Sequence, residues 1–134
     1  MDATTGRIVD VNLNRLTEGL RVVEDIVRLG FEQKQLLSGI RRLRTRVGKE
    51  ILDLRKQVIL SRDSKTDLGR GDRFDRMKRR NLDDVLLANF KRAEESARVL
   101  EEVLKIEESK LSGRFKRIRF RLYDLEKQAV KALN

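Results

Sequence analysis

The stretch Asn12–Asp25, NLNRLTEGLRVVED, returns 77 residues later as Asn89–Glu102, NFKRAEESARVLEE. Asn, Arg, Glu, Arg, Val and Glu occupy the same six positions in both copies, and an acidic residue follows each copy of the pattern. A weaker correspondence joins LRTRV at 43–47 to IRFRL at 118–122. The chain therefore contains one unit twice, and each unit reads as a pair of helices.

Apolar residues recur at spacings of three and four around both copies, which is typical of amphipathic helices. We expect four helices, at about residues 8–29, 33–60, 81–106 and 110–133. The first two form repeat one, about residues 8–60, and the last two form repeat two, about residues 81–133. If the two hairpins bury their apolar stripes against each other, the fold is all-α. The prediction is a single domain over 1–134, a four-helix bundle of two repeated hairpins with a long central loop.

Three residues are expected to mark helix ends. Gly30 is predicted to follow the first helix in the left-handed conformation, which glycine adopts without strain. Asn81 is predicted to cap the start of the third helix, with acidic residues in the turn behind it. Ser112 is a candidate cap for the fourth helix.

The composition limits the chemistry. The chain has no cysteine and no histidine, so disulfides, thiolates and the commonest general base are excluded. Any metal would be a hard, oxygen-liganded ion. The formal net charge of +10 favours an anionic partner. No leader or membrane-spanning stretch is evident, so we expect a cytoplasmic protein without a membrane partner. The many Lys, Arg and Glu residues also suit a thermophile.

The duplicated stretch contains the first candidate site residues. Asn12 and Asn89 fall inside the apolar arc of their helices, and Arg15 and Arg92 flank that arc. A polar residue in an apolar arc needs a partner. In one interpretation the asparagines are buried structural bridges and the Arg/Glu pairs are ordinary ion pairs. In the other, these side chains converge from two facing helices on a cavity in the bundle.

The central loop, about residues 61–80, is long enough to suggest a site loop. Its Gly69-Arg70-Gly71 segment is either a turn or a grip on phosphate through backbone amides and arginine. The basic run 76–80 lacks interleaved aromatic residues, so a solvated flank is favoured over a nucleic-acid contact. Matching basic stripes at 41–46 and 116–121 would face acidic residues of the first and third helices, or an anion.

Several segments together resemble a known family of small helical domains. The segments are RIVDVNLNR at 7–15, EGLRVVED at 18–25, Arg62-Asp63, Asp67-Leu68-Gly69, ANFKRAEE at 88–95, ARVLEE at 97–102 and RFRLYDLEK at 119–127. They resemble the monofunctional hydroxymethylpyrimidine phosphate kinases, which occur alone or fused to the N-terminus of bacterial thiamine-phosphate synthase. This chain resembles the stand-alone form, although 70–80 is more basic than the family pattern.

The resemblance implies a reaction, the ATP-dependent phosphorylation of 4-amino-5-hydroxymethyl-2-methylpyrimidine phosphate to its diphosphate, with Mg²⁺ as cofactor. Phosphoryl transfer depends on positioning and charge neutralisation, so the absence of histidine is no obstacle. The residues expected to act in catalysis are Arg15, Arg92, Glu18 and Glu95. The residues expected to bind substrate or phosphate are Asn12, Asn89, Arg21, Arg98, Arg62, Gly69, Arg119 and Tyr123. Asp63 and Asp67 are the expected Mg²⁺ ligands, and Glu18 and Glu95 are further carboxylates for the ion.

Other classes of function stay open from the sequence. A basic helical module that binds nucleic acid would also carry this charge, and would show a steep salt dependence. A non-catalytic accessory domain of the thiamine pathway, or a bundle that forms a homodimer, is the other alternative.

Overall fold

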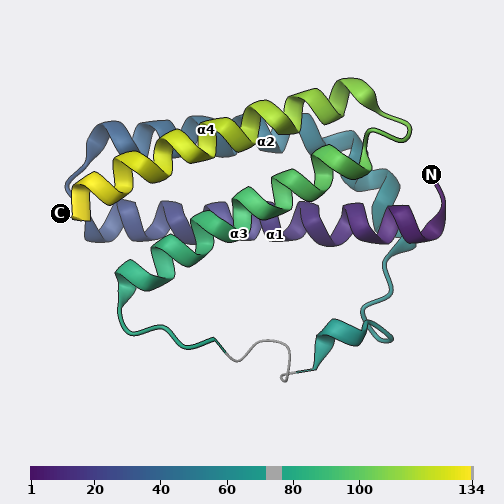
Figure 1. The fold of residues 1–134 in the computed structure, drawn as a ribbon, viewed down its shortest axis with the longest axis horizontal. Coiled ribbons are helices and arrows are strands. Elements are labelled where there is room, and N and C mark those ends of the chain that lie inside the picture. The colour runs from purple at the N-terminus through teal and green to yellow at the C-terminus, as the bar shows by residue number, and fades with distance from the viewer. Residues whose placement is uncertain (72–76, 134) are drawn as a thin grey trace.

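The computed structural model describes residues 1–71 and 77–133 of the chain (Figure 1). Within that part there are four α-helices and no strands: α1 Ala3–Gly30, α2 Lys34–Val58, α3 Leu82–Val103 and α4 Ser109–Leu133. Two short 3₁₀ helices, η1 Ile59–Ser61 and η2 Leu68–Arg70, lie in the central loop. The predicted all-α bundle with a long connection between its two hairpins is confirmed.

The helices form two layers, with α1 and α3 crossing in one and α2 and α4 side by side in the other (Figure 1). The most extensive packing is between α1 and α3, the two helices that carry the duplicated stretch. The central loop leaves α2, passes along the outer side of the α1/α3 layer and returns at α3 (Figure 1). The loop and the α2/α4 layer therefore lie on opposite sides of α1 and α3.

The core consists of the apolar arcs that the sequence predicts. In α1 the buried set includes Leu13, Leu16, Leu20 and Val23, and in α3 it includes Phe90, Ala93, Ala97 and Leu100. The helices approach closely at Gly19, where an added Cβ would lie 3.2 Å from the carbonyl oxygen of Asn89. The equivalent position in repeat two is Ser96, which is also small and buried. Small residues at both positions let the two helices cross.

Repeated ion pairs join each helix of the α1/α3 layer to its partner in the other layer. Arg44 on α2 donates to Glu24 on α1 at 3.0 Å, and Arg119 on α4 donates to Glu101 on α3 at 2.9 Å. Both glutamates are buried. One arginine of each predicted basic stripe, Arg44 or Arg119, thus faces an acidic residue of the first or third helix, and this contact repeats in both hairpins.

Three helix ends differ from the prediction. α1 begins five residues earlier than expected because the Asp2 side chain accepts a hydrogen bond from the Thr5 amide and caps it. Gly30 is the last residue of α1, and no glycine in the described residues has a positive φ, so the left-handed cap was wrong. Ser112 lies inside α4, not at its start.

The other ends follow from hydrogen bonds as well. The buried Ser112 hydroxyl donates to the Glu101 carbonyl at 2.7 Å, which satisfies an acceptor near the end of α3. α3 ends at Val103, after which the amides of Lys105 and Ile106 bond to carbonyls three residues earlier instead of four. Asn81 caps its start as expected, accepting from the Asp84 amide. In the described part of the chain, no helix is long and apolar enough to cross a membrane.

Candidate functional site

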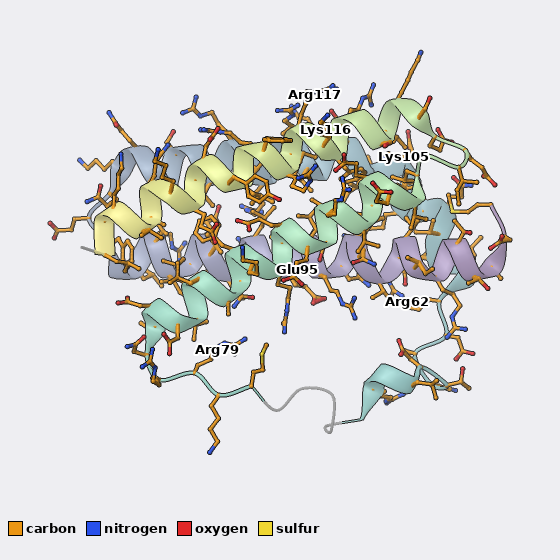
Figure 2. All side chains as sticks on the ribbon, in the orientation of Figure 1. Arg62, Arg79, Glu95, Lys105, Lys116 and Arg117 are labelled. Atoms are coloured by element: carbon orange, nitrogen blue, oxygen red, sulfur yellow. The ribbon has the colours of Figure 1, made fainter. Side chains whose placement is uncertain are left out.

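A groove of about 640 Å³ opens between α1, α3 and the central loop. We call it the α1/α3 groove. It is lined by Asn12 and Arg15 of α1, Ala88, Lys91, Arg92, Glu95, Ser96 and Val99 of α3, and Gly69, Met77 and Arg79 of the loop. Figure 2 shows Glu95 on the loop side of α3 and Arg79 on the facing loop segment. Five of the residues predicted from the sequence are therefore brought together here.

The lining of this groove suits a phosphate-bearing ligand with a ring. Arg15, Arg79, Lys91 and Arg92 bring four cations to it, and guanidinium groups bind phosphate oxygens in a bidentate way. Aliphatic side chains of α3 and the loop form the apolar part of the wall. Its volume lies in the range of small-molecule sites.

Two smaller pockets continue from the groove beneath the loop. The first, about 330 Å³, is lined by Arg15, Ser64, Asp67, Gly69 and Arg70, and shares Arg15 and Gly69 with the groove. The second, about 110 Å³, is lined by Arg7, Asp10, Val11, Asn14, Arg62, Asp63, Ser64 and Asp67. Arg15 therefore borders both of the larger spaces. Residues 72–76, including Arg76 of the predicted basic run, lie outside the described residues.

The two asparagines are not equivalent in the structure. Each donates from its side-chain amide to a carbonyl one turn earlier, Asn12 to Ile8 at 2.9 Å and Asn89 to Val85 at 2.8 Å. Only Asn12 also lines the groove, while the Asn89 backbone faces Gly19 at the helix crossing. Among the residues described, the Asn12 side-chain amide makes this one hydrogen bond, so its oxygen and second N–H could contact the edge of a ring in the groove.

Four predicted ligand-binding residues lie in ion-pair clusters instead of lining the groove. Arg21 pairs with Glu24 at 3.0 Å, and Arg98 pairs with Glu101 at 3.3 Å, each at i,i+3. Arg119 donates to Glu101 and also to the Tyr123 hydroxyl at 3.1 Å. For Arg21, Arg98, Arg119 and Tyr123 the geometry matches the structural interpretation of the Arg/Glu pattern.

Arg62 lines the 110 Å³ pocket, and Glu18 lines none of the cavities found among the described residues. The Arg62 guanidinium makes a bidentate pair with the buried Asp10 carboxylate, at 2.7 and 2.8 Å, and so fixes the start of the loop to α1. Glu18 is exposed on α1, close enough for its charge to raise the pKa of Arg62 after the larger effect of Asp10. Neither a free Arg62 nor a groove-lining Glu18 is found.

The predicted Mg²⁺ ligands already shape the loop. The Asp63 carboxylate accepts from the Thr66 amide and hydroxyl, and these bonds lower the pKa of Asp63. Asp67 accepts from the Gly69 amide and starts η2. No group of three or more metal-ligating side chains occurs among the residues described. Two carboxylates are still compatible with Mg²⁺, because this ion usually takes most of its other ligands from phosphates and water.

Glu94 is a buried acid that sequence reasoning missed. It pairs with the groove residue Lys91 at 3.2 Å, and its Oε2 atom is buried with no hydrogen-bond partner in the described part of the chain. Burial raises the pKa of Glu94 to about 7, with a further contribution from the Glu126 carboxylate of α4, against the Lys91 ammonium. Comparison of the two repeats could have singled out Glu94, because the equivalent position in repeat one is the neutral Thr17.

This raised pKa gives a stability prediction with a defined sign. Unfolded Glu94 ionises near 4.5 and folded Glu94 near 7, so stability falls as the pH rises between these values. The loss reaches at most about 3 kcal/mol at pH 8. We expect Glu94→Gln to remove this loss. The free energy of unfolding of the variant, minus that of the wild type, should therefore be larger at pH 8 than at pH 4.5. Chemical denaturation at both pH values measures the difference.

Glu95→Gln is the matched control, because Glu95 is exposed on the same helix. The difference between its free energy of unfolding and that of the wild type should change little between the two pH values. A Glu94→Gln variant that is equally destabilised at both would contradict the assignment.

The fold and the groove together define a class, an all-α bundle with a cation-lined groove between two helices and a loop. The chain belongs to the ThiD2 family, whose model matches residues 7–128. It is similar to proteins named thiamine-phosphate synthase. It is 39% identical to the one from Synechococcus sp. (strain CC9605), in a match that covers 98% of this chain and 37% of the relative. It is 36% identical to the one from Nostoc punctiforme, in a match that covers 90% of this chain and 34% of the relative. The one from Thermosynechococcus vestitus is 39% identical, in a match that covers 90% of this chain and 34% of the relative.

The chain thus spans little more than a third of the length of the curated relatives that it matches. No solved structure matches it significantly. The family is established over nearly the whole chain, whereas the relatives' full activity belongs to proteins about three times as long.

Proposed function

We propose that this chain acts in thiamine biosynthesis, as a kinase that converts 4-amino-5-hydroxymethyl-2-methylpyrimidine phosphate to the diphosphate with ATP. The observation that carries the proposal is the α1/α3 groove, where residues of the duplicated stretch meet the loop. The thiamine-phosphate synthase name of the relatives supports the pathway. The cations and aliphatic wall of the groove support a substrate that joins a heterocycle to a phosphate.

The reaction joins two anions, so its main requirement is charge neutralisation. A phosphate oxygen of the pyrimidine substrate attacks the γ-phosphorus of ATP, the bond to the β-phosphate oxygen breaks, and ADP leaves. The attacking oxygen is already deprotonated at neutral pH, so no general base is needed. Arg15 and Arg92, from facing helices, would hold the phosphates in line and stabilise the charge on the transferred group.

The position of Arg15 supports a specific division of the site. Arg15 borders both the α1/α3 groove and the 330 Å³ pocket of Ser64, Gly69 and Arg70. A phosphate in each space would place the transfer at their junction. Asn12 would orient a ring in the groove. The loop pocket, whose described lining has two arginines, the Asp67 carboxylate and no apolar side chain, would hold phosphate.

Mg²⁺ fits at the loop end of this arrangement, where Asp63 and Asp67 are the carboxylates beside the pocket. When bound, the ion would neutralise the charge of the nucleotide phosphates. The chain's own part is to hold the two carboxylates in place, through Thr66 and the Gly69 amide.

A direct test is ³¹P NMR of the purified chain with ATP, MgCl₂ and the pyrimidine monophosphate. We expect the monophosphate resonance to be replaced by diphosphate resonances, with ADP formed in equal amount. The matched control is the unphosphorylated pyrimidine alcohol, which lacks the attacking phosphate and should yield no ADP above background. Absence of product from the monophosphate, with a folded protein, would refute the kinase proposal.

A further inference from the structure

The positive charge of the chain is concentrated in the layer opposite the groove. α2 and α4 each contain eight Lys or Arg residues and two Asp or Glu residues. By contrast, α1 contains four of each sign, and α3 contains three basic and six acidic residues. The α2/α4 layer therefore carries more positive charge than the whole chain's net +10.

Six cations define a basic face on the outside of this layer: Lys34, Arg42 and Lys49 of α2, and Arg117, Arg121 and Lys131 of α4. Five of them are exposed on the side of each helix away from its buried apolar stripe, whereas Arg121 is half-buried at the contact between α2 and α4. Figure 2 shows Arg117 on α4, pointing away from the loop and the groove. The Arg121 guanidinium reaches across to α2, where its nitrogen would lie 3.2 Å from a Cβ added to Gly39. Arg121 thus lies between the exposed cations of α2 and those of α4.

These six cations are not neutralised by the rest of the molecule. None of them forms an ion pair with an acidic residue in the described parts of the chain, unlike Arg44, Arg114 and Arg119 on the same helices. Like charges held together repel one another and destabilise the compact state. An anionic partner on this face would relieve the repulsion.

The shape of the face indicates which polyanion fits. From Lys34 to Lys49 the basic face extends along α2 for about 23 Å, and the exposed Lys56 continues the row of cations to about 33 Å from Lys34, at a rise of about 1.5 Å per residue. That length is close to one turn of a nucleic-acid duplex, about 34 Å. A shallow basin of about 510 Å³ on α2 combines Lys34, Arg41 and Arg42 with the hydroxyl residues Ser38 and Thr45. Arginine, lysine and hydroxyl side chains are the usual donors to backbone phosphates.

Other anionic partners fit less well. A protein interface needs buried apolar or aromatic anchors at its centre, and attachment to a membrane surface needs apolar side chains that enter the lipid. The exposed large apolar residues of the two helices are few: Leu52 on α2, and Phe120, Tyr123 and Val130 on α4, where the rings of Phe120 and Tyr123 pack edge to face with centroids 5.7 Å apart. We propose that the basic face of α2 and α4 binds the phosphate backbone of a nucleic-acid duplex, independently of base sequence and of the α1/α3 groove.

Fluorescence anisotropy with a labelled 20-base-pair DNA duplex tests the proposal, at salt concentrations from 50 to 400 mM. We expect saturable binding at 150 mM salt. The variant Arg42→Gln/Lys49→Gln/Arg117→Gln/Arg121→Gln should bind at least 100-fold more weakly. The slope of log affinity against log salt should become shallower by about 3 to 4, because four phosphate contacts are lost. Circular dichroism checks that the variant is folded.

The matched control removes the same net charge from other surfaces: Arg28→Gln/Lys65→Gln/Lys78→Gln/Lys105→Gln. We expect the affinity of this control variant for the duplex to fall by less than 3-fold. Arg15→Ala/Arg92→Ala, which alters the groove, should also retain binding. Equal losses in the two quadruple variants would mean that net charge alone acts, and would overturn the proposal. It would equally be overturned by no binding at 150 mM salt, or by preferred binding to vesicles with 30% anionic lipid.

Discussion

Replacing Arg15 or Arg92 with alanine is expected to lower kcat/KM for the pyrimidine phosphate at least 100-fold, without loss of the fold. Both guanidinium groups line the α1/α3 groove and are exposed. Neither forms an ion pair within the described residues, so their removal leaves no buried charge unpaired. In phosphoryl transfer such a group acts on the charge of the transferred phosphate, where one arginine contributes about 10³-fold or more. Steady-state kinetics and thermal melts of both variants measure the two effects.

Arg28→Ala is the matched control, because Arg28 is an exposed arginine of α1 that lines none of the cavities described above. Its activity and Tm should equal those of the wild type. Arg15→Lys should recover only part of the activity, since an ammonium group lacks the bidentate geometry. If both alanine variants keep kcat/KM within 3-fold of the wild type, the reaction does not take place in the groove.

Glu101→Ala is expected to cause the largest loss of stability, about 3 to 5 kcal/mol, because it removes one partner of a buried ion pair. The Glu101 side chain is 5% exposed and that of Arg119 is 12% exposed. The variant leaves Arg119 without its carboxylate, and Arg98 loses a partner as well. Urea denaturation at pH 7 measures the difference in the free energy of unfolding.

The next residue in the chain provides the control. Glu102 also pairs with Arg98, at 3.1 Å, but its side chain is 46% exposed. Solvent screens exposed pairs, so Glu102→Ala should change the Tm little. If the two variants behave alike, the pair of Glu101 with Arg119 does not stabilise the bundle. If Glu101→Ala instead stays fully stable and loses activity, that glutamate belongs to a binding site.

The arrangement of the helices could be predicted because apolar spacing reports burial directly. Leu13, Leu20, Phe90 and Leu100 lie in the core as their spacing requires. Helix ends were less predictable, since they depend on single hydrogen bonds such as that from Thr5 to Asp2. Periodicity gives no sign of such a bond.

The candidate site was predictable only where it lies on helices. Asn12, Arg15, Arg92 and Glu95 share one groove, and the duplication had already singled them out. The contribution of Met77 and Arg79 depends on the path of the loop, which no repeat pattern encodes.

Asymmetry between the repeats was also hidden in the sequence. In repeat one, Arg55 of α2 donates to Asn14 and Thr17. At the equivalent positions of repeat two, Lys91 and Glu94 pair with each other instead. The chain has one central loop, which lies over α1 and α3. The two similar helices therefore form a single groove, and each contributes different side chains to it. The duplicated sequence thus provides a symmetric framework, and the loop and these substitutions make the site single.

The central claim is that both substrates bind at the α1/α3 groove and the loop pocket that adjoins it, and ¹⁵N chemical-shift mapping tests it most directly. The uniformly labelled chain is titrated with the pyrimidine monophosphate, and separately with a non-hydrolysable ATP analogue and MgCl₂. We predict that the largest amide shifts occur at Asn12, Arg15, Gly69, Arg92 and Glu95, and saturate with one ligand of each kind per chain. Largest shifts around Glu24 and Glu101 instead, or no saturable shifts at all, would contradict the claim.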